Sequence, residues 1–273
     1  MAHLFQVGAG SGGMPVLDMV CRDRRIDHVT LVEPDLYKAH NVERHLFAPN
    51  DVGKLKADLA KRWLCVRRPD LEIDLLIADL TDPARQEEME AAAANCDLGV
   101  CAADNEAAKY HFDALMRQFA KPWTLGEVLS GGIGGFVHRF VPGGPCYGCV
   151  ASHLKRDALV EKPNAVDYSQ PNGAMIETTV PADIASIHAV AGLHAVITKE
   201  LLDAGPVKSD HGALSLLLTL KQVPDLFPEA FRPFRFRIAR SADCLICRPP
   251  ERELASEELD AALSQALARL GDG

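Results

Sequence analysis

The sequence LFQVGAGSGG, residues 4–13, places four glycines directly after a short apolar run. The segment that follows, Met14–Cys21, has the apolar spacing of a helix. Gly8, Gly10 and Gly13 fit the pattern GxGxxG, in which the backbone turns tightly and approaches a phosphate at the start of a helix. A purely structural turn is the alternative explanation. The pattern alone does not distinguish NAD, FAD, S-adenosylmethionine and ATP.

The first 140 residues alternate between strand-like and helix-like stretches. Strands are predicted at 4–7, 28–32, 73–78 and 97–102, and helices at 14–21, 51–64, 83–95 and 105–119. Alternation of this kind favours a parallel sheet with helical crossovers. We therefore predict an α/β fold with a doubly wound, Rossmann-like, mostly parallel sheet.

The pattern changes after Trp123. Residues 136–141 and 215–220 resemble strands without short helices between them, which favours antiparallel strands at the C-terminal end of the sheet. A polar stretch over 151–181 is predicted to be a long loop, either functional or disordered, and Asp183–Leu202 a helix. We expect one domain over residues 1–250, with a nucleotide-binding part at 1–140, a crossover loop at 151–181 and a helical tail at 251–273.

Composition excludes several classes of protein. Among 273 residues, 29 are Lys or Arg and 38 are Asp or Glu, so the net charge of −9 disfavours binding to nucleic acid. No apolar run reaches the roughly 18 residues of a membrane-spanning helix. The N-terminus shows no signal peptide, so we expect a cytoplasmic protein in which cysteine spacing matters more than cysteine number.

Polar residues follow the predicted strands at the edge where nucleotides bind in such folds. Glu33 lies 20 residues after Gly13 and is placed to accept hydrogen bonds from ribose hydroxyls. The other candidates supply an amide, two cations and an acid: Asn41, Arg44, Lys56 and the pair Asp104-Asn105. Cations that neutralise phosphate oxygens and an acid that holds Mg²⁺ suit chemistry at a phosphate, which hydride transfer does not require. Taken singly, Asn41 is typical of a turn, Asp104 of a helix cap, and a lone Arg or Lys of the solvated surface.

Four of the eight cysteines form two CxxC pairs, Cys146/Cys149 and Cys244/Cys247. Four thiolates suit tetrahedral Zn²⁺, provided that the fold brings together pairs that are 95 positions apart. A redox-active CxxC is the alternative, but that motif starts a helix after a strand, which neither pair clearly does. The remaining four are predicted to be buried structural cysteines: Cys21, Cys65, Cys96 and Cys101.

These stretches together resemble the MoeB/ThiF/HesA adenylyltransferases, the bacterial relatives of ubiquitin-activating enzymes. The resemblance rests on VGAGSGG, LVEPDLYKAHNVERHLF, DVGKLK, CDLGVCAADN, PCYGC and CLIC, which occur in family order along nearly the whole chain. It implies adenylation by ATP of the C-terminal carboxylate of a small ubiquitin-like or sulfur-carrier protein that ends in Gly-Gly.

The resemblance also implies roles for individual residues. Gly8, Gly10, Ser11 and Gly13 would form the ATP phosphate loop, Glu33 would bind the ribose, and Asp35 corresponds to a second acid of the family. The triphosphate would contact Asn41, Arg44 and Lys56. Asp104, with Asn105 beside it, would hold Mg²⁺. The two CxxC pairs would bind one structural zinc, and Arg44, Lys56 and Asp104 would carry catalysis.

Two departures from the family shape the expected activity. The stretch 151–190 contains no cysteine, so we expect the enzyme to stop at the adenylate or to pass it to a partner's thiol. Relatives often have a helix before the first strand, from which an arginine reaches the partner subunit's ATP. Here the first predicted strand begins near His3, so we expect that cation to come from elsewhere in this chain, from another protein, or not at all. We expect a homodimer. The alternatives are an inactive ThiF-like binding module and an NAD- or FAD-dependent oxidoreductase, although the oxidoreductase leaves Arg44, Lys56, Asp104 and the cysteine pairs without a role.

Overall fold

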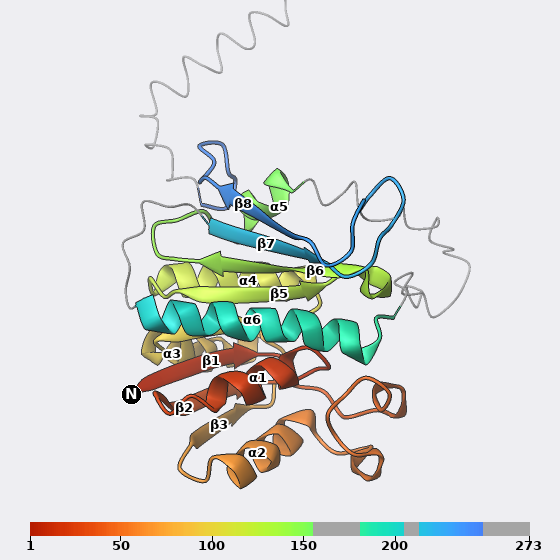
Figure 1. Ribbon diagram of the computed structural model, residues 1–273. Helices are drawn as coiled ribbons and strands as arrows, with labels where there is room; N and C mark the ends of the chain where they lie inside the picture. The colour runs from red at the N-terminus through yellow and green to blue at the C-terminus, as the bar shows by residue number, and fades with distance from the viewer. Residues whose placement is uncertain (155–180, 205–212, 248–273) are drawn as a thin grey trace, which may run out of the picture.

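A computed structural model describes residues 1–154, 181–204 and 213–247. These residues form one sheet of eight strands in the order β3-β2-β1-β4-β5-β6-β7-β8 (Figure 1). None of the helices within these ranges is long and apolar enough to cross a membrane.

The first half of the sheet is parallel, as the alternating pattern predicts. Its strands are β1 (Ala2–Val7), β2 (Ile26–Val32), β3 (Glu72–Leu76), β4 (Leu98–Cys101) and β5 (Trp123–Val128). β1 lies between β2 and β4, so the chain reverses its direction of travel across the sheet there. The loops that leave β1, β2 and β4 therefore meet at one edge, which is where doubly wound folds bind ligands.

The second half of the sheet is antiparallel. β6 (Gly134–Phe140) pairs with β5, and β7 (Ala213–Thr219) and β8 (Pro233–Ile238) follow in order. The antiparallel C-terminal strands are thus confirmed, but β5 and β8 were not predicted. β5 contains Gly126 and Glu127, and β8 alternates arginines with phenylalanines, so neither shows the apolar run of a buried strand.

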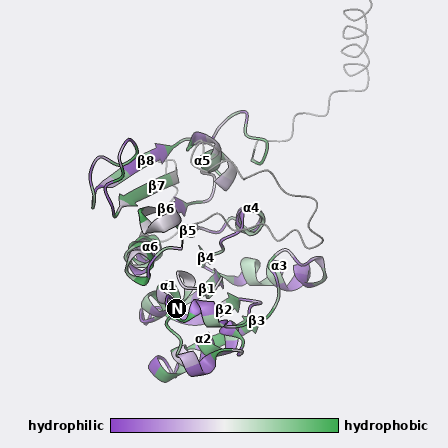
Figure 2. Ribbon diagram, turned by 90° about the vertical axis from the view of Figure 1, so that its right-hand side faces the viewer, coloured by the Kyte–Doolittle hydropathy of each residue, from purple (hydrophilic) through white to green (hydrophobic). Residues whose placement is uncertain are grey.

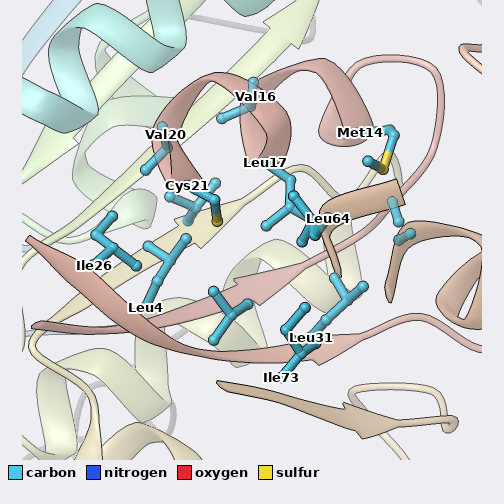
Figure 3. Close-up of a cluster of buried hydrophobic side chains, with 14 of the residues drawn as sticks. Leu4, Met14, Val16, Leu17, Val20, Cys21, Ile26, Leu31, Leu64 and Ile73 are labelled. Carbon is cyan, nitrogen blue, oxygen red and sulfur yellow. The ribbon is translucent and has the colours of Figure 1, made fainter. Parts of the chain in front are cut away.

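Helices cover both faces of the sheet (Figure 2). One face carries α1 (Gly13–Cys21), α2 (Lys56–Arg67) and α6 (Ile184–Ala204), and the other carries α3 (Gln86–Asn95), α4 (Glu106–Gln118) and α5 (Tyr147–His153). Figure 3 shows α1 side chains such as Leu17 directed toward Leu4 and Leu31 of the strands. Burial of these apolar side chains, at about 25 cal/mol per Å², holds the layers together.

Several predicted boundaries were wrong. The helix predicted at 51–64 starts at Lys56 and ends at Arg67, because Pro49–Asp51 forms a separate 3-10 turn and Gly53 adopts a positive φ of 93°. The helix predicted at 83–95 begins with a 3-10 turn at Pro83–Arg85, capped by the Asp82 side chain. The helix that begins after Asp183 is confirmed, and Asp183 accepts a hydrogen bond from the Ser186 amide at 2.9 Å. Most of the predicted crossover loop and the whole predicted tail lie outside the described residues.

Candidate nucleotide and metal sites

The glycine loop joins β1 to α1 and touches the end of β4. Gly8 has a φ of +91°, and a Cβ at this position would lie 2.7 Å from the Ala102 carbonyl oxygen. A Cβ on Gly13 would lie 2.3 Å from the Gly8 carbonyl oxygen, whereas nothing lies within 4 Å of one on Gly10. Gly8 and Gly13 are therefore required by the turn itself. The space at Gly10 leaves the backbone accessible, as a phosphate-binding loop requires.

Gln6, the last residue but one of β1, supports this loop from the side of the sheet. Its side-chain nitrogen donates to the carbonyl oxygens of Gly8 and Gly13, both at 2.9 Å, although its side chain is fully buried. Gln6 was not among the residues predicted to form the site. The signal was present, because an amide within an otherwise apolar buried strand needs hydrogen-bond partners.

Glu33, which follows β2, links the glycine loop to the next segment. Its Oε2 accepts from the Ala9 amide at 2.7 Å and its Oε1 from the Asp35 amide at 2.9 Å. The side chain is buried, and burial raises its pKa, while nearby Lys56 opposes that shift. Glu33 therefore orders the loop directly, and its acceptor lone pairs remain the candidate contacts for a ribose.

Lys56 stands at the first position of α2. Its Nζ lies 2.7 Å from Asp35 Oδ2, and its amide donates to the Asp35 carbonyl at 2.9 Å. The lysine is only 7% exposed, whereas Asp35 is exposed. A nearly buried cation beside the glycine loop, paired with an acid that solvent can screen, is placed to neutralise an incoming anion.

The segment between β2 and α2 brings in Asn41 and Arg44. Asn41 is buried, and its Oδ1 accepts from the Lys38 amide at 3.0 Å, so it is a turn residue as well as a site candidate. Arg44 is half-buried and lies close enough to His45 to help lower its pKa.

His45, which was not predicted as a site residue, contacts the loop from the other side. Its Nε2 lies 3.0 Å from the Ala9 carbonyl oxygen, and its Nδ1 accepts from the Phe47 amide. Burial, together with the charges of Lys56 and Arg44, lowers its pKa to about 4, so the ring is neutral and donates from Nε2. Ala9 is thus held through its amide by Glu33 and through its carbonyl by His45. The position of His45 within the NVERHLF stretch was the available signal.

Asp104 and Asn105 follow β4 and have different roles. Asn105 is the N-cap of α4, and its Oδ1 accepts from the Ala108 amide at 2.7 Å. Asp104 was considered as a possible helix cap, but the residue that caps α4 is its neighbour Asn105. Asp104 is exposed, and no ion pair joins it to any side chain in residues 1–154, 181–204 and 213–247. An exposed carboxylate two residues beyond Ala102, which touches the glycine loop, suits a divalent cation bound to a nucleotide.

The four cysteines of the CxxC pairs converge. Their Sγ atoms all lie within 4.8 Å of one another, with 3.7 Å between Cys146 and Cys149 and 3.5 Å between Cys149 and Cys247. Tetrahedral Zn²⁺ with Zn–S bonds of 2.3 Å separates its sulfurs by about 3.8 Å, so this donor set fits the ion. Contrary to the sequence analysis, Cys146 does begin a helix, as the N-cap of α5. Clustering of all four thiols favours the metal over a redox pair.

The other cysteines are buried in three cases out of four. Burial raises the pKa of Cys21 and Cys96 to about 12 and that of Cys101 to about 11, as expected for inert core thiols. The prediction for Cys65 was wrong, because this residue lies on the exposed side of α2.

The Rossmann-like sheet, with its braced glycine loop and four-cysteine cluster, places the chain in a class of α/β proteins with a mostly parallel, doubly wound sheet. Within that class, the chain belongs to the ThiF family, whose model matches residues 2–226.

Curated relatives are similar at low identity. Adenylyltransferase and sulfurtransferase uba4 of Pyricularia oryzae is 24% identical over 254 residues, covering 90% of this chain and 49% of that protein. The SAMP-activating enzyme E1 of Haloferax volcanii is 26% identical over 150 residues, covering 55% of this chain and 53% of that protein. The chain spans about half the length of these relatives.

Among solved structures, E. coli MccB in complex with SeMet MccA superimposes with a TM-score of 0.64 at 17% identity, covering 90% of this chain and 66% of that one. E. coli MccB with ATP gives a TM-score of 0.60 at 17% identity, with the same coverage. This likeness shows the fold.

Proposed function

We propose that the protein uses ATP and Mg²⁺ to adenylate the C-terminal carboxylate of a small ubiquitin-like or sulfur-carrier protein. The observation that carries the proposal is Lys56, a nearly buried cation at the start of α2, which faces the segment ordered by Glu33. Family membership and the names of the curated relatives support the same chemistry.

The residues divide the work as follows. The backbone of the glycine loop and the cations Arg44 and Lys56 hold and neutralise the phosphates, while Glu33 receives the ribose hydroxyls. Asp104 would hold Mg²⁺, and the ion would supply charge stabilisation at the phosphate oxygens. The acceptor carboxylate is already ionised at neutral pH, so no general base is required. Attack of the carboxylate on the α-phosphorus then releases pyrophosphate, and the protein contributes positioning and charge.

The four-cysteine cluster has a structural role in this proposal. With all four positions taken by thiolates, a bound zinc keeps no open site for substrate. Within residues 1–154 and 181–204 the remaining cysteines lie in the core or on α2, consistent with an enzyme that stops at the adenylate or passes it to a partner's thiol.

The test is ATP–pyrophosphate exchange with purified full-length protein. The acceptors are carrier proteins that end in Gly-Gly, and short peptides, because the structural neighbours include MccB with MccA. We expect exchange that depends on a carrier and on Mg²⁺ and that falls at least about a hundredfold in Asp104→Ala. Lys54→Met, which removes an exposed lysine paired with Asp51, is the control for Lys56→Met. Full exchange in Asp104→Ala, or equal losses in the two lysine variants, would contradict the assignment. If only peptides support ATP–pyrophosphate exchange, the substrate would be a peptide and not a carrier protein.

A further inference from the structure

A chain of polar side chains connects the four-cysteine cluster to the first turn of α4. At its centre is Lys109, only 5% exposed. Its Nζ lies 2.7 Å from Glu106 Oε1, on the same helical turn, and 2.7 Å from Glu127 Oε1 on β5. A buried ammonium ion between two carboxylates has few alternative positions, because the loss of either partner leaves a charge uncompensated.

Tyr147 attaches the cysteine cluster to this arrangement. It is the first residue of α5 and lies between Cys146 and Cys149 in the chain. Its hydroxyl donates to Glu106 Oε2 at 2.8 Å, and its amide donates to Asp113 Oδ1 at 3.0 Å. Glu106 and Asp113 are seven residues apart, which is about two turns, so they lie on one face of α4. Tyr147 therefore holds α4 at two points along one face.

The chain continues through the antiparallel half of the sheet. The second oxygen of Glu127 lies 3.1 Å from His138 Nε2 on β6, and His138 Nδ1 lies 2.7 Å from Ser215 Oγ on β7. Burial lowers the pKa of His138 to about 3, so this ring is neutral. The first turn of α4 is thus connected to β5, β6, β7 and α5.

The positions of these side chains exclude two other functions, a hydrolytic triad and a phosphate-binding lysine. Ser215, His138 and Glu127 occur in the order of a hydrolytic triad, but Ser215 and His138 are fully buried, so no substrate reaches the hydroxyl. Lys109 is not a phosphate ligand, because both of its carboxylate partners lie at 2.7 Å and compensate its charge.

We propose that Tyr147, Glu106 and Lys109 form a positioning chain that transmits the order of the four-cysteine site to Asp104. Asp104 lies next to Asn105, the cap of α4, and is tied by no ion pair within the described residues, so its place follows that of the first turn. For this reason metal at the cysteines supports the cation-binding end of the nucleotide site. The importance of Asp104 rests on the proposed function, whereas the coupling of the cysteine site to α4 does not.

The first experiment is amide hydrogen exchange on residues 104–109 of the full chain, without nucleotide. We expect Lys109→Met to accelerate exchange there roughly tenfold, the size of one lost charge-assisted hydrogen bond, and Lys109→Arg to restore most of the protection. Arg85→Met breaks an exposed ion pair with Glu88 on the same side of the sheet and is the matched control. Equal exchange in Lys109→Met and in the control would overturn the proposal.

The second experiment links the metal to the chain. Removal of metal with a chelator should accelerate exchange at residues 104–109 in the wild type. Tyr147→Phe, which keeps the ring and removes the hydroxyl, should show faster exchange while zinc content stays at the wild-type level. Chelation should then increase the amide exchange rate by a smaller factor in this variant than in the wild type, because both changes release Glu106. Fully additive effects, or an α4 unaffected by chelation, would contradict the coupling.

Activity gives an independent readout. We expect the Mg²⁺ concentration for half-maximal ATP–pyrophosphate exchange to rise by roughly tenfold in Lys109→Met and Tyr147→Phe, while Arg85→Met leaves it unchanged. An unchanged Mg²⁺ dependence with altered amide exchange would refute the link to Asp104. A wild-type protein without exchange activity would refute the proposed function and leave the amide-exchange result to decide the coupling.

Discussion

The two halves of the sheet are held together in different ways. In the parallel half, β1 to β5 are flanked by helices whose apolar side chains fill two large clusters, and the loops at one edge carry the candidate nucleotide residues. In the antiparallel half, β7 and β8 pack smaller clusters, and the cysteine site joins the segment after β6 to the segment after β8. A small core needs a further link, which a metal ion held by the four cysteines would supply. The candidate nucleotide residues and the candidate metal site therefore lie in different halves of the sheet, with α4 between them.

Cys244→Ser should produce the largest difference in stability between the two halves of the sheet. Loss of one thiolate removes a ligand of the structural site, and the binding energy of such a site contributes several kcal/mol to folding. We expect zinc content to fall and amide protection to be lost first in α5, β7 and β8, while β1 and β2 keep their protection. Cys21→Ser, in the core of the parallel half, is the comparison variant. Simultaneous loss of protection in both halves of Cys244→Ser would show that the cysteine site stabilises the whole sheet.

The next effect concerns the glycine loop. Gly13→Ala should destabilise the protein by about 2 kcal/mol or more, because the new Cβ would lie 2.3 Å from the Gly8 carbonyl oxygen. Gly10→Ala should leave the free energy of unfolding within about 0.5 kcal/mol of wild type, since nothing lies within 4 Å of its Cβ. Chemical denaturation measures both changes. If Gly10→Ala nevertheless weakens ATP binding, the space above Gly10 belongs to the nucleotide.

The smallest expected effect is a difference in stability between variants of two neighbouring residues, Asn105 and Asp104. Asn105→Ala removes the cap of α4 and should cost about 1 kcal/mol of stability. Asp104→Ala makes no such change and should leave the denaturation midpoint close to wild type. A large loss of stability in Asp104→Ala would mean that this carboxylate supports the fold, and its activity loss would no longer indicate a metal ligand.

The sequence predicted β1 to β4 and the helices between them well because these elements repeat a local pattern. β1, β2 and β4 are apolar runs buried on both faces, and the glycines between β1 and α1 have steric requirements that few other residues meet. β5 and β8 were not predicted, because Gly126, Glu127 and the exposed arginines of β8 interrupt the apolar pattern of a strand. Their strand state comes from pairing with distant segments, which no local window contains.

For the candidate sites, the sequence by itself determined the residue types: the glycine loop, the acids after β2 and β4, the lysine of DVGKLK and the two CxxC pairs. Only the tertiary structure decided which of them meet and which support the others. It brought four thiols from segments about a hundred residues apart within 4.8 Å, gave the cap of α4 to Asn105, and placed Gln6, His45 and Tyr147 in bracing positions. The physical reason is that chemistry resides in single side chains, whereas burial and hydrogen-bond partners arise only when distant segments pack together.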